Sequence, residues 1–144
     1  MTEIAFHFNV PDRLAHACRL VRKAMGQGAR LVVAGPKEQL ARVDQALWSF
    51  APAEFLAHCD AGAPAAVIAA SPVLLAEDLA APLPHRELLI NLGEAVPPGF
   101  GQFGRLIEIV PQSGDAERQS ARLRWKHYSD RGYAIVRHDL AAAD

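Results

Sequence analysis

The sequence has few cysteines, little net charge and no long apolar run. Its two cysteines, Cys18 and Cys59, lie far apart and form neither a CxxC pair nor a Cys/His ligand spacing. This excludes a disulfide-stapled secreted fold, and we expect both thiols to be reduced, buried and inert. The formal net charge of -1 and the pI near 6.6 exclude the broad basic field with which duplex-binding proteins neutralise phosphates.

The sequence also lacks any stretch of about 20 apolar residues that could cross a membrane. The opening segment, MTEIAFHFNV, has no basic region followed by an apolar core. We therefore expect a soluble, cytoplasmic protein without membrane contact. At 144 residues and 51% hydrophobic composition, residues 1–144 are expected to form a single globular domain.

The motifs of common chemistries are missing as well. The turns after the first two expected strands read NVPDR and AGPKEQ, and neither contains a glycine-rich phosphate loop. GFGQFG at 99–104 precedes a strand and opens no helix, so it is interpreted as an ordinary connection. The six histidines show no HExxH motif, and no serine or cysteine sits in a G-x-S-x-G elbow. We expect no catalytic residues, no metal and no cofactor.

What is present is an alternation of strand and helix patterns. Residues 2–9 alternate apolar and polar side chains, and from Arg13 apolar residues recur every three or four positions until Gly26. Residues 30–34 form a buried-strand run, and Pro36 suits the first position of the next helix. Further expected elements are a short strand at 55–58, an apolar run at 65–70, a proline-punctuated linker at 71–84, strands at 87–91, 105–110 and 133–139, and a helix from Asp115 to about Arg131. This order predicts a Rossmann-like, three-layer α/β domain with a mostly parallel sheet and no nucleotide-binding loops.

The segment ARLRWKHYSDRGYAI, residues 121–135, gathers basic and aromatic side chains. On a helix, Arg118, Arg122 and Trp125 lie four and then three residues apart, so they share one face. Arg124 and Lys126 fall on other faces and are interpreted as solvent-facing. Two interpretations stay open from the pattern itself: an ordinary helix with a solvated charged face, or a local binding strip for an acidic ligand.

Several blocks resemble the chi subunit of bacterial DNA polymerase III. They are VDQALWSFAPAEFLAH at 43–58, ELLINL at 87–92, IVP at 109–111 and ARLRWKHYSDRGY at 121–133, in this order along nearly the whole chain. The resemblance implies a Rossmann-like fold without nucleotide chemistry, in agreement with the missing loops. It implies a non-catalytic replisome accessory subunit that binds the C-terminal tail of single-stranded DNA-binding protein. DNA contact would then be indirect.

The resemblance also implies which residues bind this tail, which is acidic and ends in Pro-Phe. Arg122 and Trp125 match the tail-binding arginine and aromatic of the family, although the family has tyrosine where Trp125 stands. Arg118 matches a further basic residue, and Val110 lies near the apolar wall of the pocket. An arginine holds a carboxylate through two parallel hydrogen bonds, and an aromatic ring receives a phenylalanine side chain.

Trp48 and Phe55 match the family's docking surface for the psi subunit, which a DinG-like repair helicase is implied to share. By pattern alone these two aromatics also fit a plug that seals a helix end beside Pro52. For the whole chain, the alternative function is a small Rossmann-type nucleotide-binding protein or enzyme. That alternative rests on the fold by analogy, with no residue set behind it.

Overall fold

Seven parallel strands form the centre of the molecule. The structure is a computed structural model that describes residues 1–50, 58–60, 72–79 and 83–141. Its elements are β1 (Glu3–Val10), α1 (Arg13–Gly26), β2 (Leu31–Ala34), α2 (Lys37–Phe50), β3 (His58–Asp60), β4 (Val73–Ala76), β5 (Leu88–Asn91), the 3-10 turn η1 (Phe100–Gln102), β6 (Arg105–Pro111), α4 (Asp115–Asp130) and β7 (Ile135–Asp139). The expected alternation of strands and helices is confirmed in this part of the chain.

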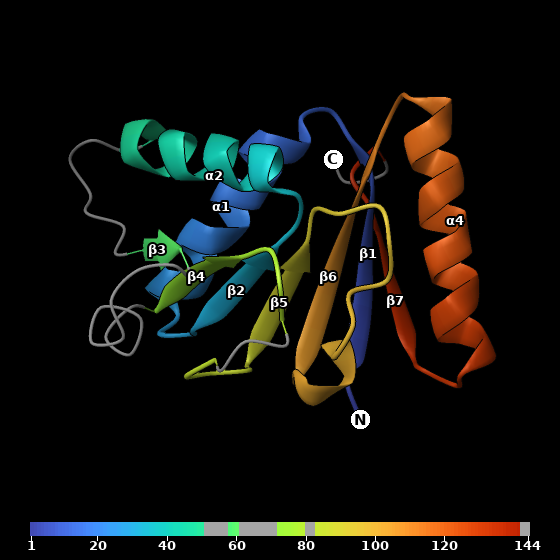
Figure 1. Ribbon diagram of the computed structural model, residues 1–144. Helices are drawn as coiled ribbons and strands as arrows, with labels where there is room; N and C mark the ends of the chain where they lie inside the picture. Colours follow the sequence, from blue (N-terminus) through green and yellow to red (C-terminus); the bar gives the residue numbers. More distant parts are fainter. Residues whose placement is uncertain (51–57, 61–71, 80–82, 142–144) are drawn as a thin grey trace.

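The strand order across the sheet is β3-β4-β2-β5-β6-β1-β7. Every pairing is parallel, and α1, α2 and α4 supply the crossovers from β1 to β2, from β2 to β3 and from β6 to β7. The first strand, β1, lies between β6 and β7, so the first and last strands of the sheet are neighbours (Figure 1). Phe6 of β1 is in register with Glu108 of β6 and Arg137 of β7. These three strands carry the candidate site.

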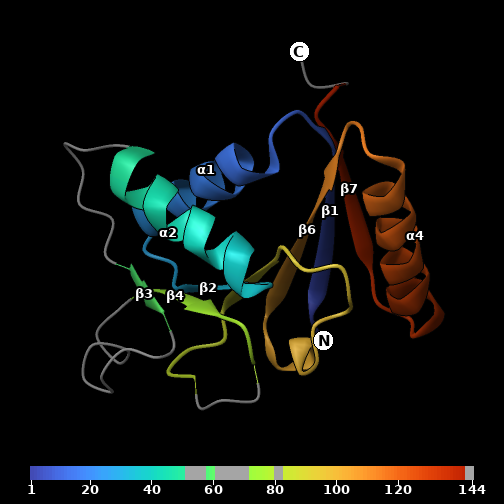
Figure 2. The same cartoon turned by 45° about the horizontal axis from the view of Figure 1, so that its top comes forward.

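Two hydrophobic layers enclose the sheet. Helices α1 and α2 cover one face, and α4 lies on the other face over β6, β1 and β7 (Figures 1 and 2). The strands alternate between the layers: Ala5 and Ile107 pack toward α1, whereas Ile4, Phe6 and Leu106 pack toward α4. The architecture is therefore the three-layer Rossmann-like fold that the sequence predicts.

Local signals set the ends of the helices. The Asp12 side chain caps α1 by accepting a hydrogen bond of 3.1 Å from the Ala15 amide. Gly114 precedes α4 with a φ of 104°, and Gly132 follows it with a φ of 80°. Both angles lie in the region that favours glycine. Asn9, with a φ of 56°, interrupts the pairing of β1 with β6 before Val10, and Val10 packs into the α1 layer.

The interpretation of 71–84 as a linker is wrong, because Val73–Ala76 forms the interior strand β4. All four residues of β4 are buried, since the sheet is covered on both faces here. The strand was missed because the prolines at 72, 82 and 84 are typical of a linker. Pro72 lies just before β4, where its carbonyl accepts a hydrogen bond of 2.8 Å from Leu31, so the missing amide hydrogen costs the ladder nothing.

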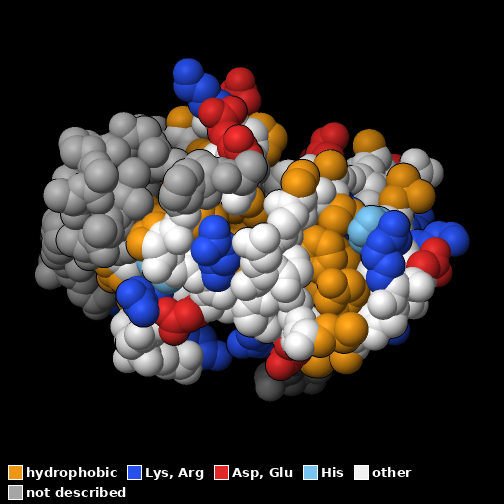
Figure 3. Space-filling view, turned by 60° about the horizontal axis from the view of Figure 1, so that its bottom comes forward, with side chains coloured by type: hydrophobic (Ala, Val, Ile, Leu, Met, Phe, Trp, Pro, Cys, Tyr) orange, Lys and Arg blue, Asp and Glu red, His pale blue; other side chains and the backbone are white. Residues whose placement is uncertain are grey.

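Some sequence predictions fall on residues outside the described ranges. These are the apolar run at 65–70 and residues 55–57 of the expected short strand, while β3 begins at His58. Cys18 is buried as expected, and burial raises the pKa of its thiol to about 11. In the described part of the chain, no helix is both long and apolar enough to span a membrane. Basic and acidic side chains are interspersed on the face drawn in Figure 3, as the small net charge suggests.

Candidate functional site

A buried carboxylate holds α4 against the sheet. Glu108 of β6 is fully buried and accepts a hydrogen bond of 3.0 Å from Nε of Arg124. Its other oxygen accepts a hydrogen bond of 2.6 Å from the Tyr128 hydroxyl, and Asn91 of β5 donates to the same carboxylate. Two residues of α4, four positions apart, are thus tied to a single group on the sheet. These bonds fix the orientation of α4 and therefore of its other side chains, including Arg118, Arg122 and Trp125.

The expectation that Arg124 faces solvent is wrong. Only 4% of this residue is exposed, and its Nη1 also donates to the carbonyl of Glu94 and to the hydroxyl of Ser120. Burial in the low-dielectric core raises the pKa of Glu108, and the charge of Arg124 opposes that rise. The helical spacing correctly predicted that Arg124 and Arg122 lie on different faces of α4. It could not show that the face of Arg124 packs against a buried acid, Glu108. Lys126 is exposed as expected and pairs with Asp130.

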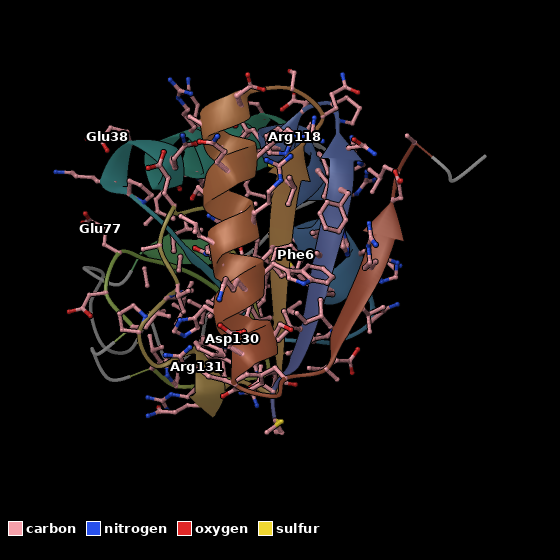
Figure 4. All side chains as sticks on the ribbon, turned by 90° about the vertical axis from the view of Figure 1, so that its right-hand side faces the viewer. Phe6, Glu38, Glu77, Arg118, Asp130 and Arg131 are labelled. Atoms are coloured by element: carbon pink, nitrogen blue, oxygen red, sulfur yellow. The ribbon has the colours of Figure 1, made fainter. Side chains whose placement is uncertain are left out.

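A different side of α4 from the one that carries Arg124 and Tyr128 lines a cavity of about 350 Å³, here called the α4 pocket. Its walls come from α4, β6, β1 and β7 and consist of Phe6, Phe8, Val110, Arg118, Ala121, Arg122, Trp125 and Arg137. Figure 4 shows Arg118 on the flank of α4 that faces β6 and β1, with Phe6 on β1 beside the same flank. All four residues predicted for the tail site, Val110, Arg118, Arg122 and Trp125, line this single cavity.

An aromatic cluster forms one part of the α4 pocket. The Trp125 ring lies 5.0 Å from the Phe6 ring and 5.9 Å from the Phe8 ring, measured between centroids. The interplanar angle between Trp125 and Phe6 is 62°, an edge-to-face arrangement that aromatic quadrupoles favour. Trp125 and Phe8 are only partly buried, so their rings present apolar surface to a ligand.

Three arginines give the α4 pocket its charge. Arg122 and Arg137 are exposed and Arg118 is partly exposed, and no acidic side chain lines the cavity among the residues the structure describes. The Arg137 guanidinium carbon lies 5.1 Å from the Phe8 ring centroid and 5.8 Å from that of Trp125, within cation-π range. A site with guanidinium groups beside open aromatic rings is suited to a ligand that has both a carboxylate and an apolar side chain.

Phe6, Phe8 and Arg137 belong to the pocket but were not singled out from the sequence. Phe6 and Phe8 were recognised as the apolar face of a strand, which on a covered sheet is ordinarily core. Arg137 sits in the expected last strand, and only the pairing of β7 with β1 brings it beside Phe8. The alternation of residues 4, 6 and 8 indicated that Phe6 and Phe8 share one face of a strand. Only the pairing of β1 with β7 shows that this face borders the α4 pocket.

The residues predicted for a second partner surface lie apart from the α4 pocket. Trp48 is on α2, the helix that covers the opposite face of the sheet, and is 55% exposed. Phe55 lies outside the described residues. In the described ranges, no group of three or more His, Cys, Asp or Glu side chains is arranged to hold a metal ion.

Comparison with known proteins places the sequence in a family. The family model of the DNA polymerase III chi subunit, HolC, matches residues 1–136. The chain belongs to the DNA polymerase III chi subunit family. It is 35% identical to the DNA polymerase III subunit chi of Pseudomonas aeruginosa, over 97% of this chain and 98% of that protein. It is 30% identical to the subunit chi of Haemophilus influenzae, over 83% of this chain and 81% of that protein.

Membership in this family makes the chain a replisome accessory subunit of the DNA polymerase III assembly. The family is non-catalytic, in keeping with the sequence prediction that no catalytic residues are present. The resemblance of the four sequence blocks to the chi subunit is thereby confirmed, since the match covers the positions of all four.

Proposed function

We propose that the α4 pocket binds the acidic C-terminal tail of single-stranded DNA-binding protein and so links that protein to the polymerase III assembly. The observation that carries this proposal is the convergence of Val110, Arg118, Arg122 and Trp125 on a single cavity. These residues come from β6 and α4, and they are the four that the resemblance to the chi subunit implies for the tail. A tethering role of this kind needs only a local cationic site, which fits a net charge of -1.

Each part of the tail has a counterpart in the α4 pocket. Arg122 is assigned to the terminal carboxylate, because its exposed guanidinium can form two parallel hydrogen bonds with a carboxylate. The terminal phenylalanine ring is assigned to the apolar surface of Trp125, Phe8 and Val110. Arg118 and Arg137 remain for the acidic residues that precede the end of the tail.

The experiment is a calorimetric titration of the chain with an acidic peptide ending in Pro-Phe. Replacing Arg122→Ala removes a charge-assisted contact and should cost about 2–3 kcal/mol of binding free energy. The dissociation constant should then rise by roughly one to two orders of magnitude. Amidating the peptide's C-terminus should produce a similar loss with the unsubstituted chain. It should add little in Arg122→Ala, because both changes remove the same contact.

Lys126→Ala is the matched control on the same helix, since Lys126 is exposed and does not line the α4 pocket. Arg124 cannot serve as a control, because its removal disturbs the buried carboxylate beneath α4. Full additivity of amidation and Arg122→Ala, or an equal loss in Lys126→Ala, would contradict the assignment. Titrations with ATP and NAD test the alternative of a nucleotide-binding protein, and we expect no saturable binding of either.

We propose a second protein-binding surface around Trp48, for the psi subunit or a DinG-like helicase. The support is a tryptophan that exposes 55% of its surface on α2, on the far side of the sheet from α4. Large exposed aromatic residues are typical anchors of protein interfaces. Trp48→Ala should remove affinity for such a partner and leave binding of the tail peptide unchanged. Loss of folding in this variant would instead favour the role of a helix plug. We also propose that the chain acts in the cytoplasm, where the replisome works.

A further inference from the structure

A second and larger cavity lies on the face of the sheet opposite to α4. It has a volume of about 740 Å³ and runs between α1 and the exposed faces of β1 and β7. The cavity exists because α1 packs toward β6, while no helix of the described residues covers the edge strand β7 on this side and Val136 is 41% exposed. We call it the basic groove. Its polar lining residues are His7, His16, Arg19, Lys23, Gln27, Arg105, Arg137, His138 and Asp139.

Cations in the basic groove outnumber anions. Arg19 and Lys23 are exposed, four residues apart on α1, and Arg105 is exposed at the start of β6. The one acid among the lining residues, Asp139, already accepts hydrogen bonds from the Asn9 side chain and the Ala141 amide. Near the rim, Glu3 lies 3.9 Å from Arg105, a loose and exposed pair that leaves the guanidinium available.

Three histidines from three elements line the middle of the basic groove. Nδ1 of His7 lies 2.8 Å from Nε2 of His16, and the ring of His138 is 4.9 Å from the ring of His7. Nδ1 of His16 is buried and has no hydrogen-bond partner in the part of the chain that the structure describes. Burial, together with the charges of His16, His138, Arg105 and Lys23, lowers the pKa of His7 to about 4. The exposed Arg19, Lys23 and Arg105 give the groove a positive electrostatic potential, a condition that favours an anionic ligand.

We propose that the basic groove binds the phosphate backbone of single-stranded nucleic acid. The cations are spread along the groove and are not focused on one point. His16 and Lys23 lie seven residues apart on α1, about 10 Å at 1.5 Å per residue, and Arg105 lies on β6, so these groups address different parts of a ligand. An extended polyanion meets such a row of charges better than a single phosphate group does.

The family of the chain favours DNA over other polyanions, because an accessory subunit of a DNA polymerase works beside single strands. The basic groove lies on the opposite face of the sheet from the α4 pocket. Arg137 is the one described residue that lines both, and its guanidinium lies beside Phe8 and Trp125 in the α4 pocket, so a strand and a protein tail can be held simultaneously. Apart from the histidines, aromatic rings are absent from the lining residues of the basic groove. Binding should therefore depend on phosphates and be weak, independent of base sequence and sensitive to salt.

The test measures the anisotropy of a short fluorescent oligothymidylate titrated with the full chain at about 0.1 M salt, where charges more than about 10 Å apart are largely screened. Arg19→Glu combined with Lys23→Glu should weaken binding by at least about tenfold, because two phosphate contacts become repulsive. The matched control is Arg118→Glu combined with Arg122→Glu, which changes the net charge by the same amount in the α4 pocket. It should change oligothymidylate binding by less than about twofold, because its charges lie outside the groove. The four residues are at least partly exposed, so both variants should fold, and circular dichroism checks this.

The two variants separate this inference from the proposed tail binding. The groove variant should retain affinity for the acidic peptide ending in Pro-Phe, and the control variant should lose it. A logarithmic salt slope of about -2, from three phosphate contacts on a single strand, is expected for the unsubstituted chain. Equal losses of oligothymidylate in both variants, or no binding by the unsubstituted chain, would overturn the proposal. So would equally tight binding of free tripolyphosphate, which would indicate a site for small phosphates, or loss of the peptide in the groove variant alone.

Discussion

Replacing Arg124→Ala tests the central claim about how α4 is held in place. The substitution removes the ion pair of 3.0 Å with Glu108 and the bond of 2.9 Å to the Glu94 carbonyl. Glu108, which is fully buried, then keeps only its hydrogen bonds to Tyr128 and Asn91. Breaking a buried ion pair by removing one partner costs about 3–5 kcal/mol, because a buried charge is left uncompensated. We expect a loss of this size in the free energy of unfolding at pH 8.

The loss should shrink as the pH falls. Burial already raises the pKa of Glu108 above its ordinary value of 4.5, and Arg124 opposes this rise. A carboxyl whose pKa is raised in the folded state contributes stability below its unfolded pKa, and that contribution is lost as the pH rises through the folded pKa. Without Arg124, the folded pKa rises further, so stability falls with pH over a wider range. For this single proton, the slope is bounded at about 1.4 kcal/mol per pH unit.

Urea denaturation at several pH values between 5 and 8 measures the free energy of unfolding of the unsubstituted chain and of Arg124→Ala. The difference between the two, plotted against pH, gives the contribution of the Glu108 carboxyl. Lys126→Ala is the matched control, since its pair with Asp130 is exposed and should contribute less than about 1 kcal/mol. The double variant Glu108→Gln with Arg124→Met should recover part of the loss, because no charge remains buried. The role assigned to Glu108 would be refuted if Arg124→Ala lowered the free energy of unfolding no more than Lys126→Ala does. It would also be refuted if the loss in Arg124→Ala did not depend on pH, because the Glu108 carboxylate would then not be the group that holds α4 against the sheet.

Three further outcomes are expected. Trp125→Ala should weaken tail-peptide binding by about tenfold or more in calorimetry, through lost contact with the terminal ring, and should leave oligothymidylate binding unchanged. Cys18 should resist alkylation in the folded chain at pH 8 and react after denaturation, as followed by mass spectrometry, because burial raises its pKa to about 11; rapid labelling of the native thiol would contradict this. In an NMR titration, the imidazole of His7 should change protonation near pH 4 and at a higher pH when oligothymidylate is bound, since phosphate stabilises the charged ring; an unshifted midpoint near 6.5 in the free chain would refute the burial of this group.

The middle of the chain shows the limit of pattern reading for the fold. The strands at 105–110 and 87–91 were predicted within one or two residues, because a continuous apolar run is what a strand buried on both faces needs. The equally apolar Val73–Ala76 was missed, since prolines at 72, 82 and 84 suggested a linker. Whether a proline interrupts a sheet depends on which of its backbone groups faces a neighbouring strand, and that is a property of the assembled sheet.

By itself, the sequence indicated the alternation of strands and helices except for β4, and it showed that the first two turns lack phosphate loops. The resemblance of its blocks to the chi family named Val110, Arg118, Arg122 and Trp125, which line the α4 pocket. These features depend on local periodicity and on recognisable blocks of residues, so they are present in the chain before it folds. Tertiary structure alone decided three others. Arg124 is buried because Glu108 lies beneath it, Arg137 joins the pocket because β7 pairs with β1, and His7 meets His16 because α1 crosses the sheet beside β1. Each contact joins residues that different elements supply, and no periodicity within a single element encodes which element lies across from it.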